Sequence, residues 1–395
     1  MSSTGIQHEG WQEVAISEIA DVIGGGTPRT TISEYWNGDI PWLTPRDLTS
    51  YSRLYISHGE RNITEVGLQN SSARIMPKGT VLLTSRAPIG YLAIAANEIS
   101  TNQGFKSLII NQEKAFNIFI YYWLKSNIDY LKRIGSGSTF AEISGSVVKG
   151  VKINLPPLPE QKAIAEVLRS LDYKIDLLHR QNKTLEKMAQ SLFRKWFVEE
   201  PNEEWEGKPL DEIADYLNGL ACQKYPPKDG VEKLPVLKIR ELNSGITVNS
   251  DWASIEVKEK YIVTLGDVIF SWSGSLVLKI WDGQNCILNQ HLFKVTSEKY
   301  PKWFYYFWTK HHLEKFIAIA EAKATTMGHI KRGDLASSMV LVPPNKELEE
   351  MTGIMAPNLD KIIYNLNQIN TLGNLRDTLL PKLMSGEIRL KEFSS

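Results

Sequence analysis

The strongest sign of catalytic chemistry in the sequence is a group of charged residues between positions 251 and 258. Asp251 is followed by Glu256 and Lys258, and carboxylates that bind a metal ion form the core of many nuclease sites. An acid-x-Lys triplet is also common on ordinary exposed strands, and we favour that interpretation. The seven histidines show no spacing typical of metal ligands. We interpret His311-His312 as the solvated end of a helix.

Two glycine-containing stretches come close to nucleotide-binding motifs. Gly145 and Gly150 have the spacing of a phosphate-binding loop, but Val151 stands where that loop needs lysine. Residues 135–137 are half of a dinucleotide turn, with Phe140 at the position of the third glycine. None of the proline pairs follows Asn or Asp, as it would in a methyltransferase that acts on a flipped base. The sequence therefore predicts a chain without its own catalytic site.

The sequence contains two copies of one pattern. Trp11 and Trp205 open similar segments at an offset of 194 (205 − 11), and Asn102-Gln103 and Asn289-Gln290 lie at an offset of 187 (289 − 102). A register kept over such a length is typical of an internal repeat. We therefore expect an α+β fold with two similar α/β globular domains.

A long helix is expected after each copy. Apolar residues recur at alternating steps of four and three from Ile164 to Trp196, with a similar period from Met355 to Leu379. This is the heptad spacing of helices that pack along each other. At 1.5 Å per residue the first helix would be roughly 55 Å long. We expect an antiparallel coiled coil with the domains at its opposite ends and an approximate internal two-fold axis. The expected packing residues are Leu168, Leu171, Ile175, Leu178, Asn182, Leu185, Leu192, Leu359, Ile362, Leu366 and Asn370.

Proline pairs mark the domain boundaries, because proline ends a strand and interrupts the chain before a helix. We expect the first domain at 1–155, a central spacer helix at 156–200, the second domain at 201–343 and a C-terminal spacer helix at 344–395. Asn182 and Asn370 are expected to fix the register of the helix pair. Pro357 lacks the N–H for an internal helix bond, so we expect a kink, a restart or a shorter second helix.

The composition is that of an ordinary soluble protein. Of 395 residues, 42% are hydrophobic and 23% charged, and the net charge of zero neither favours nor excludes nucleic acid. Cys222 and Cys286 lie far apart, and we expect reduced thiols rather than a disulfide or metal site. The sequence shows no signal-peptide pattern and no apolar run of the ~20 residues that span a bilayer. We expect a cytoplasmic protein without membrane contact.

Several stretches resemble the specificity subunit of type I restriction-modification systems. The most specific are LPPLPEQKAI at 155–164 and LLPKLMSGEI at 379–388. Residues 25–28 (GGTP), 40–43 (IPWL) and 101–105 (TNQGF) are also typical. The second copy departs from the pattern, with Gly-Leu-Ala-Cys at 219–222 and Asn-Lys-Glu at 345–347.

The resemblance implies a non-catalytic subunit that acts with partners. Each target-recognition domain would read one half of a bipartite sequence in double-stranded DNA. The helices would fix the distance between the halves and dock two modification subunits, which are adenine methyltransferases. The modification subunits would bind S-adenosylmethionine, and the restriction (motor-nuclease) subunits would bind ATP and Mg²⁺. This chain would hold no cofactor.

Candidate base-reading residues are loop side chains that can distinguish base edges. In copy one they are Arg29, Arg46, Arg86, Asn102, Gln103, Ser136, Ser138 and Thr139. In copy two they are Ser273, Ser275, Asn289, Gln290, His291, Lys323, Thr325, Thr326 and His329. Each is alternatively a turn-capping or surface residue. The Asn-Gln pair recurs in both copies and equally well braces a loop, since domains that read different half-sites should differ where they touch bases.

Two other functions stay open at this point. One is a fragment of a self-contained restriction-methylation enzyme, against which the missing cofactor motifs count. The other is a non-catalytic protein-binding scaffold, which the repeated polar loops do not exclude.

Overall fold

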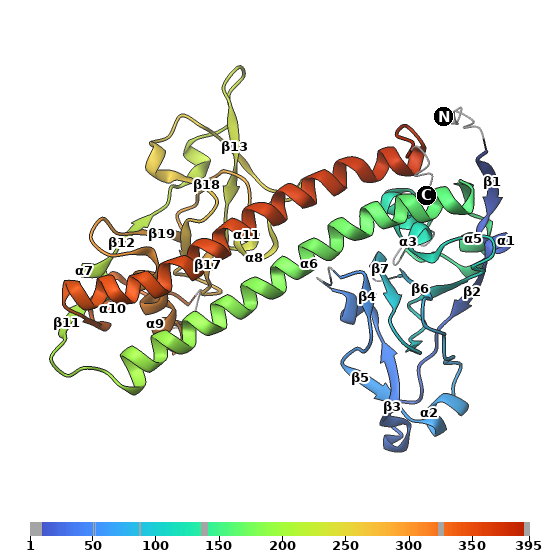
Figure 1. Ribbon diagram of the computed structural model, residues 1–395, viewed down its shortest axis with the longest axis horizontal. Coiled ribbons are helices and arrows are strands. Elements are labelled where there is room, and N and C mark those ends of the chain that lie inside the picture. Colours follow the sequence, from blue (N-terminus) through green and yellow to red (C-terminus); the bar gives the residue numbers. More distant parts are fainter. Residues whose placement is uncertain are drawn as a thin grey trace. The chain divides into compact units, whose positions relative to one another are not determined.

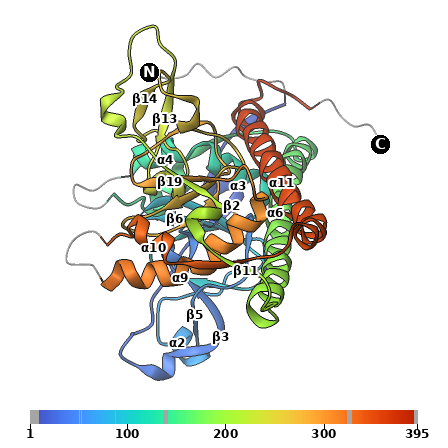
Figure 2. The same cartoon turned by 90° about the vertical axis from the view of Figure 1, so that its left-hand side faces the viewer.

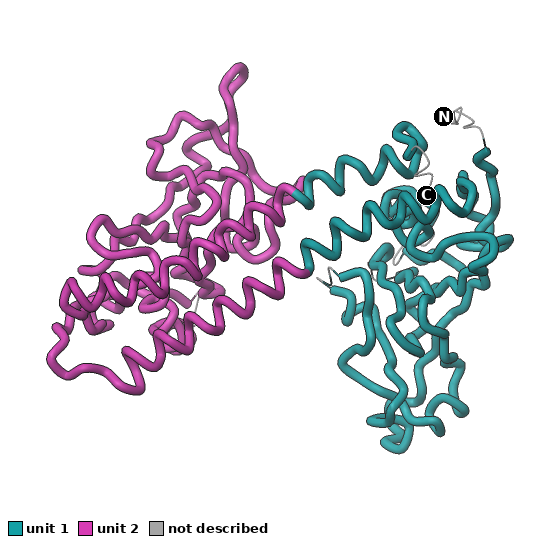
Figure 3. The backbone as a smooth tube through the Cα atoms, viewed as in Figure 1, with its two compact units in different colours: residues 1–176, 372–395 teal, residues 177–371 magenta. Residues whose placement is uncertain are grey.

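The computed structural model describes residues 10–49, 51, 53–86, 88–135, 141–322 and 328–390 (Figure 1). The chain forms two compact units. Unit 1 comprises residues 1–176 and 372–395, and unit 2 comprises residues 177–371 (Figure 3). Each unit combines small sheets with helices, so the predicted α+β class is confirmed.

Unit 1 is built on a five-stranded sheet with the order β2-β9-β6-β7-β4. A three-stranded sheet has the order β5-β3-β8, and β1 pairs with β10. The strands are β1 (Gln12–Ala15), β2 (Ala20–Gly24), β3 (Trp36–Leu43), β4 (Tyr55–Ile56), β5 (Arg61–Ile63), β6 (Val81–Ser85), β7 (Ile89–Ala95), β8 (Ser100–Thr101), β9 (Lys106–Ile110) and β10 (Lys152–Leu155). The shorter helices are α1 (Ile16–Ile19), α2 (Glu65–Gln69), α3 (Asn117–Ser126), α4 (Ile128–Ile134) and α5 (Gly145–Gly150), with 3-10 turns η1 (Ser33–Tyr35) and η2 (Pro45–Leu48).

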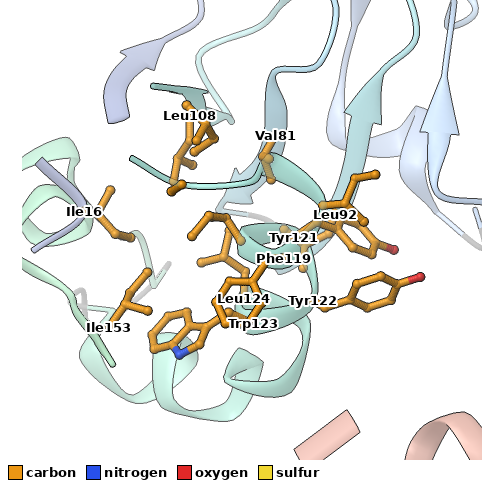
Figure 4. Packing of buried hydrophobic residues seen from close by; sticks show 14 of the residues in the cluster. Ile16, Val81, Leu92, Leu108, Phe119, Tyr121, Tyr122, Trp123, Leu124 and Ile153 are labelled. Carbon is orange, nitrogen blue, oxygen red and sulfur yellow. The ribbon is translucent and has the colours of Figure 1, made fainter. Parts of the chain in front are cut away.

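The core of unit 1 lies between its main sheet and α3. Every residue from Ile118 to Leu124 is buried, which is the pattern of a helix covered on all sides. In Figure 4, Phe119 and Leu124 of this helix lie in the same cluster as Val81 and Leu108 of the sheet. This core holds the strand ends in fixed positions.

Unit 2 repeats the plan with four strands in each of two sheets, ordered β12-β19-β16-β17 and β14-β13-β18-β15, and with β11 paired to β20. The strands are β11 (Glu206–Pro209), β12 (Asp215–Asn218), β13 (Lys233–Leu237), β14 (Trp252–Ser254), β15 (Ile262–Val263), β16 (Val268–Ser271), β17 (Leu278–Ile280), β18 (Cys286–Leu288), β19 (Leu292–Thr296) and β20 (Met339–Val342). The shorter helices are α7 (Leu210–Ile213), α8 (Ile239–Ser244), α9 (Lys302–Ala322) and α10 (Arg332–Ala336), with 3-10 turns η4 (Cys222–Lys224) and η5 (Glu259–Tyr261).

The internal repeat is confirmed at the level of strand register. In unit 1, β3 and β8 are parallel and pair Trp42 with Ser100. In unit 2, β13 and β18 are parallel and pair Val236 with Ile287. These partners are displaced by 194 (236 − 42) and 187 (287 − 100) residues, the two offsets seen in the sequence. The two units therefore share connectivity as well as composition.

The segment between the strands and each long helix is also repeated. The Trp11 indole N–H donates to Glu160 at 3.2 Å, and the Trp205 indole N–H donates to Glu347 at 3.1 Å. The sequence of copy two departs from copy one around 345–347, yet the glutamate that accepts this bond is present in both. Each bond fixes the start of a unit to the start of its helix.

The long helices are α6 (Leu158–Arg194), extended by a π-helical turn (η3, Lys195–Glu199), and α11 (Asn345–Ser385). They lie side by side in each unit (Figure 1 and Figure 2). In unit 1, Asp172 bonds Arg376 at 2.6 Å and Glu160 bonds Arg389, beyond the end of α11, at 2.9 Å. Residues earlier on α6 thus meet residues later in the chain, so the pairing is antiparallel.

The packing residues of the helix pair differ in burial. Leu168, Leu178, Leu359 and Ile362 are buried, whereas Leu171, Ile175, Leu185, Leu192 and Leu366 are half-buried. Leu375, in the same predicted stripe, is 46% exposed. The stripe is therefore a partly open seam.

Asn370 does not lie in the seam as we expected. Its amide donates to the carbonyl oxygen of Asp282 in unit 2. The amide that meets Asn182 is Asn365, which is fully buried and donates to Asn182 Oδ1 at 2.8 Å. Asn182 donates in turn to the carbonyl oxygen of Ile362 at 3.3 Å. The match of Asn182 to Asn370 followed sequence similarity, but the antiparallel arrangement places a different residue opposite.

The expectation of a restart or a shorter second helix at Pro357 was wrong, because α11 continues through this residue. With 41 residues it is longer than α6, with 37. Pro357 removes a helix bond to the carbonyl of Gly353, and both residues are exposed. That carbonyl therefore faces water, which replaces the missing N–H at low cost.

The structure also shows the positions of the paired histidines and the cysteines, and the lengths of the helices. His311-His312 lies within α9 rather than at a helix end, because α9 runs to Ala322. Both cysteines are free and buried. Across the described part of the chain, the helices are all too short or too polar to cross a membrane.

Candidate nucleic-acid interface

In unit 1, four chain segments that are far apart in sequence meet at the ends of strands. Gly26 N–H donates to the Thr101 carbonyl at 2.9 Å, Asn102 N–H to the Leu43 carbonyl at 2.8 Å, and Ser85 N–H to the Gly104 carbonyl at 2.7 Å. We call residues 25–29, 44–47, 85–86 and 102–104 loop cluster 1. It contains five of the predicted candidates, Arg29, Arg46, Arg86, Asn102 and Gln103.

Some side chains of loop cluster 1 are exposed, and others make contacts with neighbouring side chains. Arg29, Arg46 and Gln103 are exposed, and Gln103 Oε1 accepts a hydrogen bond from the Thr27 hydroxyl. Arg86 is half-buried and lies 3.5 Å from Glu142. The two exposed arginines are therefore the cations of this cluster best placed to meet an anionic ligand.

Unit 2 forms the same arrangement from residues 218–221, 272–275, 289–291 and 328–330, which we call loop cluster 2. Leu220 N–H donates to the Leu288 carbonyl at 2.9 Å, Gln290 N–H to the Leu220 carbonyl at 2.8 Å, and Gly274 N–H to the Gly328 carbonyl at 2.8 Å. A Cβ on Gly25 would overlap the Asn102 carbonyl oxygen, and one on Gly219 would overlap that of Asn289. The sequence departure at 219–222 thus preserves the glycine on which the packing depends.

The side chains of loop cluster 2 include the aromatic rings of Trp272, His291 and His329. The Trp272 ring lies 5.8 Å from that of His291 and 6.4 Å from that of His329, between ring centroids. The Ser273 hydroxyl lies 3.0 Å from His291 Nδ1. Ser275 is exposed, Gln290, His291 and His329 are half-buried, and Ser273 is buried. This cluster lacks the exposed arginines of cluster 1.

The recurring asparagine has a structural contact in both units. Asn102 Oδ1 accepts from Gly104 N–H at 2.8 Å, and Asn289 Oδ1 accepts from His291 N–H at 3.3 Å. Asn289 is only 6% exposed. These contacts favour loop bracing, the second interpretation given for these residues, over base contact.

The two clusters differ at one equivalent pair of positions. Arg86 forms an isolated β-bridge with Glu142, and Ser273 forms one with His329. The offset is 187 in both cases (273 − 86 and 329 − 142). Backbone geometry is therefore kept while an ion pair in one unit becomes a serine and a histidine in the other.

Six candidates cannot be placed, because they lie outside the described residues. These are Ser136, Ser138 and Thr139 in copy one and Lys323, Thr325 and Thr326 in copy two. The copy-two segment borders loop cluster 2 in sequence, and the copy-one segment ends two residues before Glu142, which pairs with Arg86 of loop cluster 1.

The charged group at 251–258 is engaged in ion pairs. Asp251 bonds Lys238, which lowers the pKa of the Asp251 carboxyl, and Glu256 lies 2.5 Å from Lys228. No group of three potential metal ligands occurs among the described residues.

Burial raises the pKa of the Cys222 thiol to about 11 and also raises that of Cys286. Neither thiol is activated as a nucleophile.

Sequence reasoning missed Trp272. It occupies the position equivalent to Ser85 (272 − 187), and comparison of the two copies residue by residue would have shown a tryptophan in place of a buried serine. Asn365 had no such signal, because its role depends on which residue faces it.

The chain contains two similar α+β units with equivalent loop clusters, together with two long paired helices. It therefore belongs to the class of proteins that present two related loop surfaces. A model of the type I restriction modification DNA specificity domain matches residues 8–187 and again residues 202–373. The chain belongs to this DNA specificity family.

Individual relatives agree with this assignment. The chain is 38% identical to the specificity subunit of the type I restriction enzyme MjaIX from Methanocaldococcus jannaschii, with 97% of this chain and 94% of the relative covered. It is 24% identical to the EcoKI specificity subunit from Escherichia coli, with 98% and 91% covered. The crystal structure of a type I restriction-modification S subunit from M. genitalium matches with a TM-score of 0.60 at 15% identity, over 97% of this chain and 98% of that one. This last match shows a shared fold.

Proposed function

We propose that this protein is the DNA-specificity subunit of a type I restriction-modification enzyme and that each unit reads one half of a bipartite target in double-stranded DNA. Loop cluster 1 reads one half-site and loop cluster 2 reads the other. The chain selects the sequence, and its partners carry out the chemistry.

The observation that carries this proposal is that the two loop clusters share their backbone structure but differ in their side chains. The backbone hydrogen bonds donated by Gly26, Asn102 and Ser85 recur in unit 2 as those donated by Leu220, Asn289 and Trp272, and the glycine contact recurs as well. At equivalent positions, however, they present Arg86 and Glu142 in one unit and Ser273 and His329 in the other. Two readers of different half-sites need this combination, because docking is shared whereas base-edge contacts must differ.

The contacts made by the candidates suggest which ones read bases. Arg29, Arg46 and Gln103 are exposed, and an arginine fork matches the O6 and N7 acceptors of guanine. In unit 2, Ser275, Gln290, His291 and His329 have exposed or half-exposed side chains. We assign Asn102 and Asn289 to bracing the loops. The six candidates outside the described residues stay in the proposal, because one segment adjoins loop cluster 2 in sequence and the other lies two residues before Glu142, the partner of Arg86.

The helices and partners complete the proposed assembly. The α6–α11 pair sets the distance between half-sites and docks two modification subunits, which bind S-adenosylmethionine and methylate adenine. Restriction subunits bind ATP and Mg²⁺, and the complex works in the cytoplasm. The antiparallel pairing within each unit supports the role of the helices, because interlocked side chains hold a fixed axial position.

An exchange of one unit's globular part tests the proposal. Residues 10–155 are replaced by the corresponding segment of another family member, the complex is expressed with its modification subunits, and methylated adenines are mapped across a genome. The expected result is a new sequence at one half-site, with the other half-site and the spacing unchanged.

The matched control exchanges residues 206–342 instead and should change the other half-site. If neither exchange changes the methylated sequence relative to the wild-type complex, the proposal is contradicted and a protein-binding scaffold is favoured. Methylation by the purified chain without modification subunits would favour a self-contained enzyme.

A further inference from the structure

In unit 1, an exposed arginine outside loop cluster 1 is stacked on tryptophan. The Arg61 guanidinium carbon lies 3.5 Å from the centroid of the Trp36 ring and 5.9 Å from that of Trp42. The two rings meet edge to face at 5.0 Å. Arg61 is on β5 and the tryptophans are on β3, which is its neighbour in the sheet. The cation therefore has a fixed support.

The same tryptophans connect Arg61 to the proposed reading loops. Trp42 donates its indole N–H to the Gly26 carbonyl at 2.9 Å, and Trp36 donates to the Arg29 carbonyl at 3.3 Å. Both rings are buried. Gly26 and Arg29 belong to loop cluster 1, so the stacked cation and the cluster share one rigid support.

Arg61 has no acidic partner among the described residues, in contrast to two other arginines of unit 1. Arg53 is 2.9 Å from Asp176 and Arg86 is 3.5 Å from Glu142. Among the described residues, no salt bridge to Arg61 is present. Stacking covers one face of a guanidinium and leaves its N–H edge for an in-plane, bidentate anion such as phosphate.

Unit 2 also places a cation beside a tryptophan on its equivalent sheet, with the cation and the ring on exchanged strands. Lys233 on β13 is exposed and its Nζ lies 5.7 Å from the centroid of the Trp252 ring on β14, the neighbouring strand. Trp252 is 41% exposed. Lys228 and Lys238 are paired with Glu256 and Asp251, whereas Lys233 has no salt bridge among the described residues.

We propose that Arg61 in unit 1 and Lys233 in unit 2 bind DNA phosphates beside the bases that the loop clusters read. The inference rests on the proposed function. Phosphate contacts fix the position of a protein on the duplex and carry no sequence information directly. The two tryptophan-supported cations thus orient the units, while the loop clusters supply the specificity.

The test measures DNA affinity as a function of salt for the full chain assembled with its modification subunits. Fluorescence anisotropy is recorded on one duplex that carries the mapped methylation site and on a duplex of equal length that lacks it. Each phosphate contact contributes about 0.9 to the slope of log K against log salt. We expect R61Q to reduce the slope by about 0.9 on both duplexes, K233Q to do the same, and the double variant to lose about 1.8.

Two further variants separate charge from fold. R61K keeps the charge and should keep the wild-type slope. K152Q is the matched control, because Lys152 is already paired with Glu13 at 2.7 Å, and it should leave the slope unchanged. Melting temperatures of all variants are measured to establish that each is folded.

The outcomes distinguish this inference from the proposed function. If the wild-type complex binds neither duplex, the proposed function fails. If it binds and R61Q keeps the full slope, the phosphate contact of Arg61 is wrong and the proposed function stands. A loss confined to the target duplex with unchanged slope would also overturn the inference, because it would indicate a base contact.

Discussion

At the scale of single residues, a cluster of polar contacts in unit 1 surrounds Asp172 on α6. Its carboxylate accepts from Arg376 at 2.6 Å and from the Tyr122 hydroxyl at 2.7 Å, with Lys125 at 3.8 Å. The side chain of Asp172 is only 10% exposed. One residue thus joins α6, α11 and α3, and its loss leaves Arg376 with Asp377, whose side chain is 63% exposed, as its remaining anion.

We therefore expect D172A to lower the free energy of unfolding by about 2 kcal/mol, because the Tyr122 hydroxyl loses its acceptor and Arg376 keeps only its more exposed anion. Urea unfolding followed by tryptophan fluorescence measures the change. D129A is the matched control, since Asp129 is 88% exposed in its pair with Lys132, and its effect should stay below about 0.5 kcal/mol. Equal effects of the two variants would argue against a structural role for Asp172.

His312 gives unit 2 a pH-dependent stability. Burial, with His311 and Lys315 nearby, lowers the pKa of His312 to about 4, although the Met339 carbonyl at 3.0 Å acts in the opposite sense. Between pH 6.5 and 4 the unfolded chain binds a proton that the folded chain does not. The free energy of unfolding should therefore fall as the pH is lowered through this window and should not depend on this group above it.

The contribution of His312 is measured as the difference between wild type and H312Q. The melting temperature of the wild type should drop more steeply from pH 6.5 to 4 than that of H312Q, which cannot take up this proton. Parallel curves would mean that His312 titrates normally in the folded protein.

At the scale of elements, each loop cluster depends on a glycine where two strand ends meet. Gly25 and Gly219 lie against the carbonyl oxygens of Asn102 and Asn289, so closely that a Cβ would overlap them. The neighbouring backbone cannot move aside without breaking the hydrogen bonds that join the segments. A single methyl group should therefore displace an entire reading loop.

We expect G25A to weaken binding at the half-site read by unit 1, and G219A at the half-site read by unit 2, each by about tenfold or more. The measurement is methylation of substrates altered in one half-site at a time. Gly24 is the matched control, because a Cβ there has open space and G24A should be neutral. Loss of binding at both half-sites in either variant would indicate general misfolding.

At the scale of the whole molecule, both long helices contribute residues to both units. The unit boundary falls at residues 176–177 on α6 and at 371–372 on α11. A change in helix length at these points leaves each unit's own sheets and loop clusters intact. It tests whether the helices determine the separation of the half-sites.

The variant lacks seven residues on each long helix, 173–179 on α6 and the matching 368–374 on α11. The apolar stripe of each helix keeps its direction, because seven residues make nearly two helical turns. At 1.5 Å per residue the deletion removes ~10 Å, or about three base pairs. The methylated sequence should keep both half-sites and shorten its spacer by up to about this amount. Genome-wide mapping of methylation measures the spacing, and an unchanged spacer would refute the ruler role.

The sequence alone predicted the features that arise from local and repeated patterns. Heptad spacing indicated α6 and α11, proline pairs indicated where the strands before them end, and constant offsets indicated two copies of one fold. These signals survive without a structure because helical periodicity, turn formation and duplication are written in neighbouring or regularly spaced residues.

Tertiary structure decided which distant residues meet. It placed Asn365 rather than Asn370 against Asn182, kept α11 helical through Pro357, and brought residues 26, 85 and 102 together in one cluster. It also put Arg61 on Trp36, a pairing no spacing rule suggests. Such contacts depend on how sheets and helices pack across the whole unit, and packing joins residues whose separation in sequence carries no information about their separation in space.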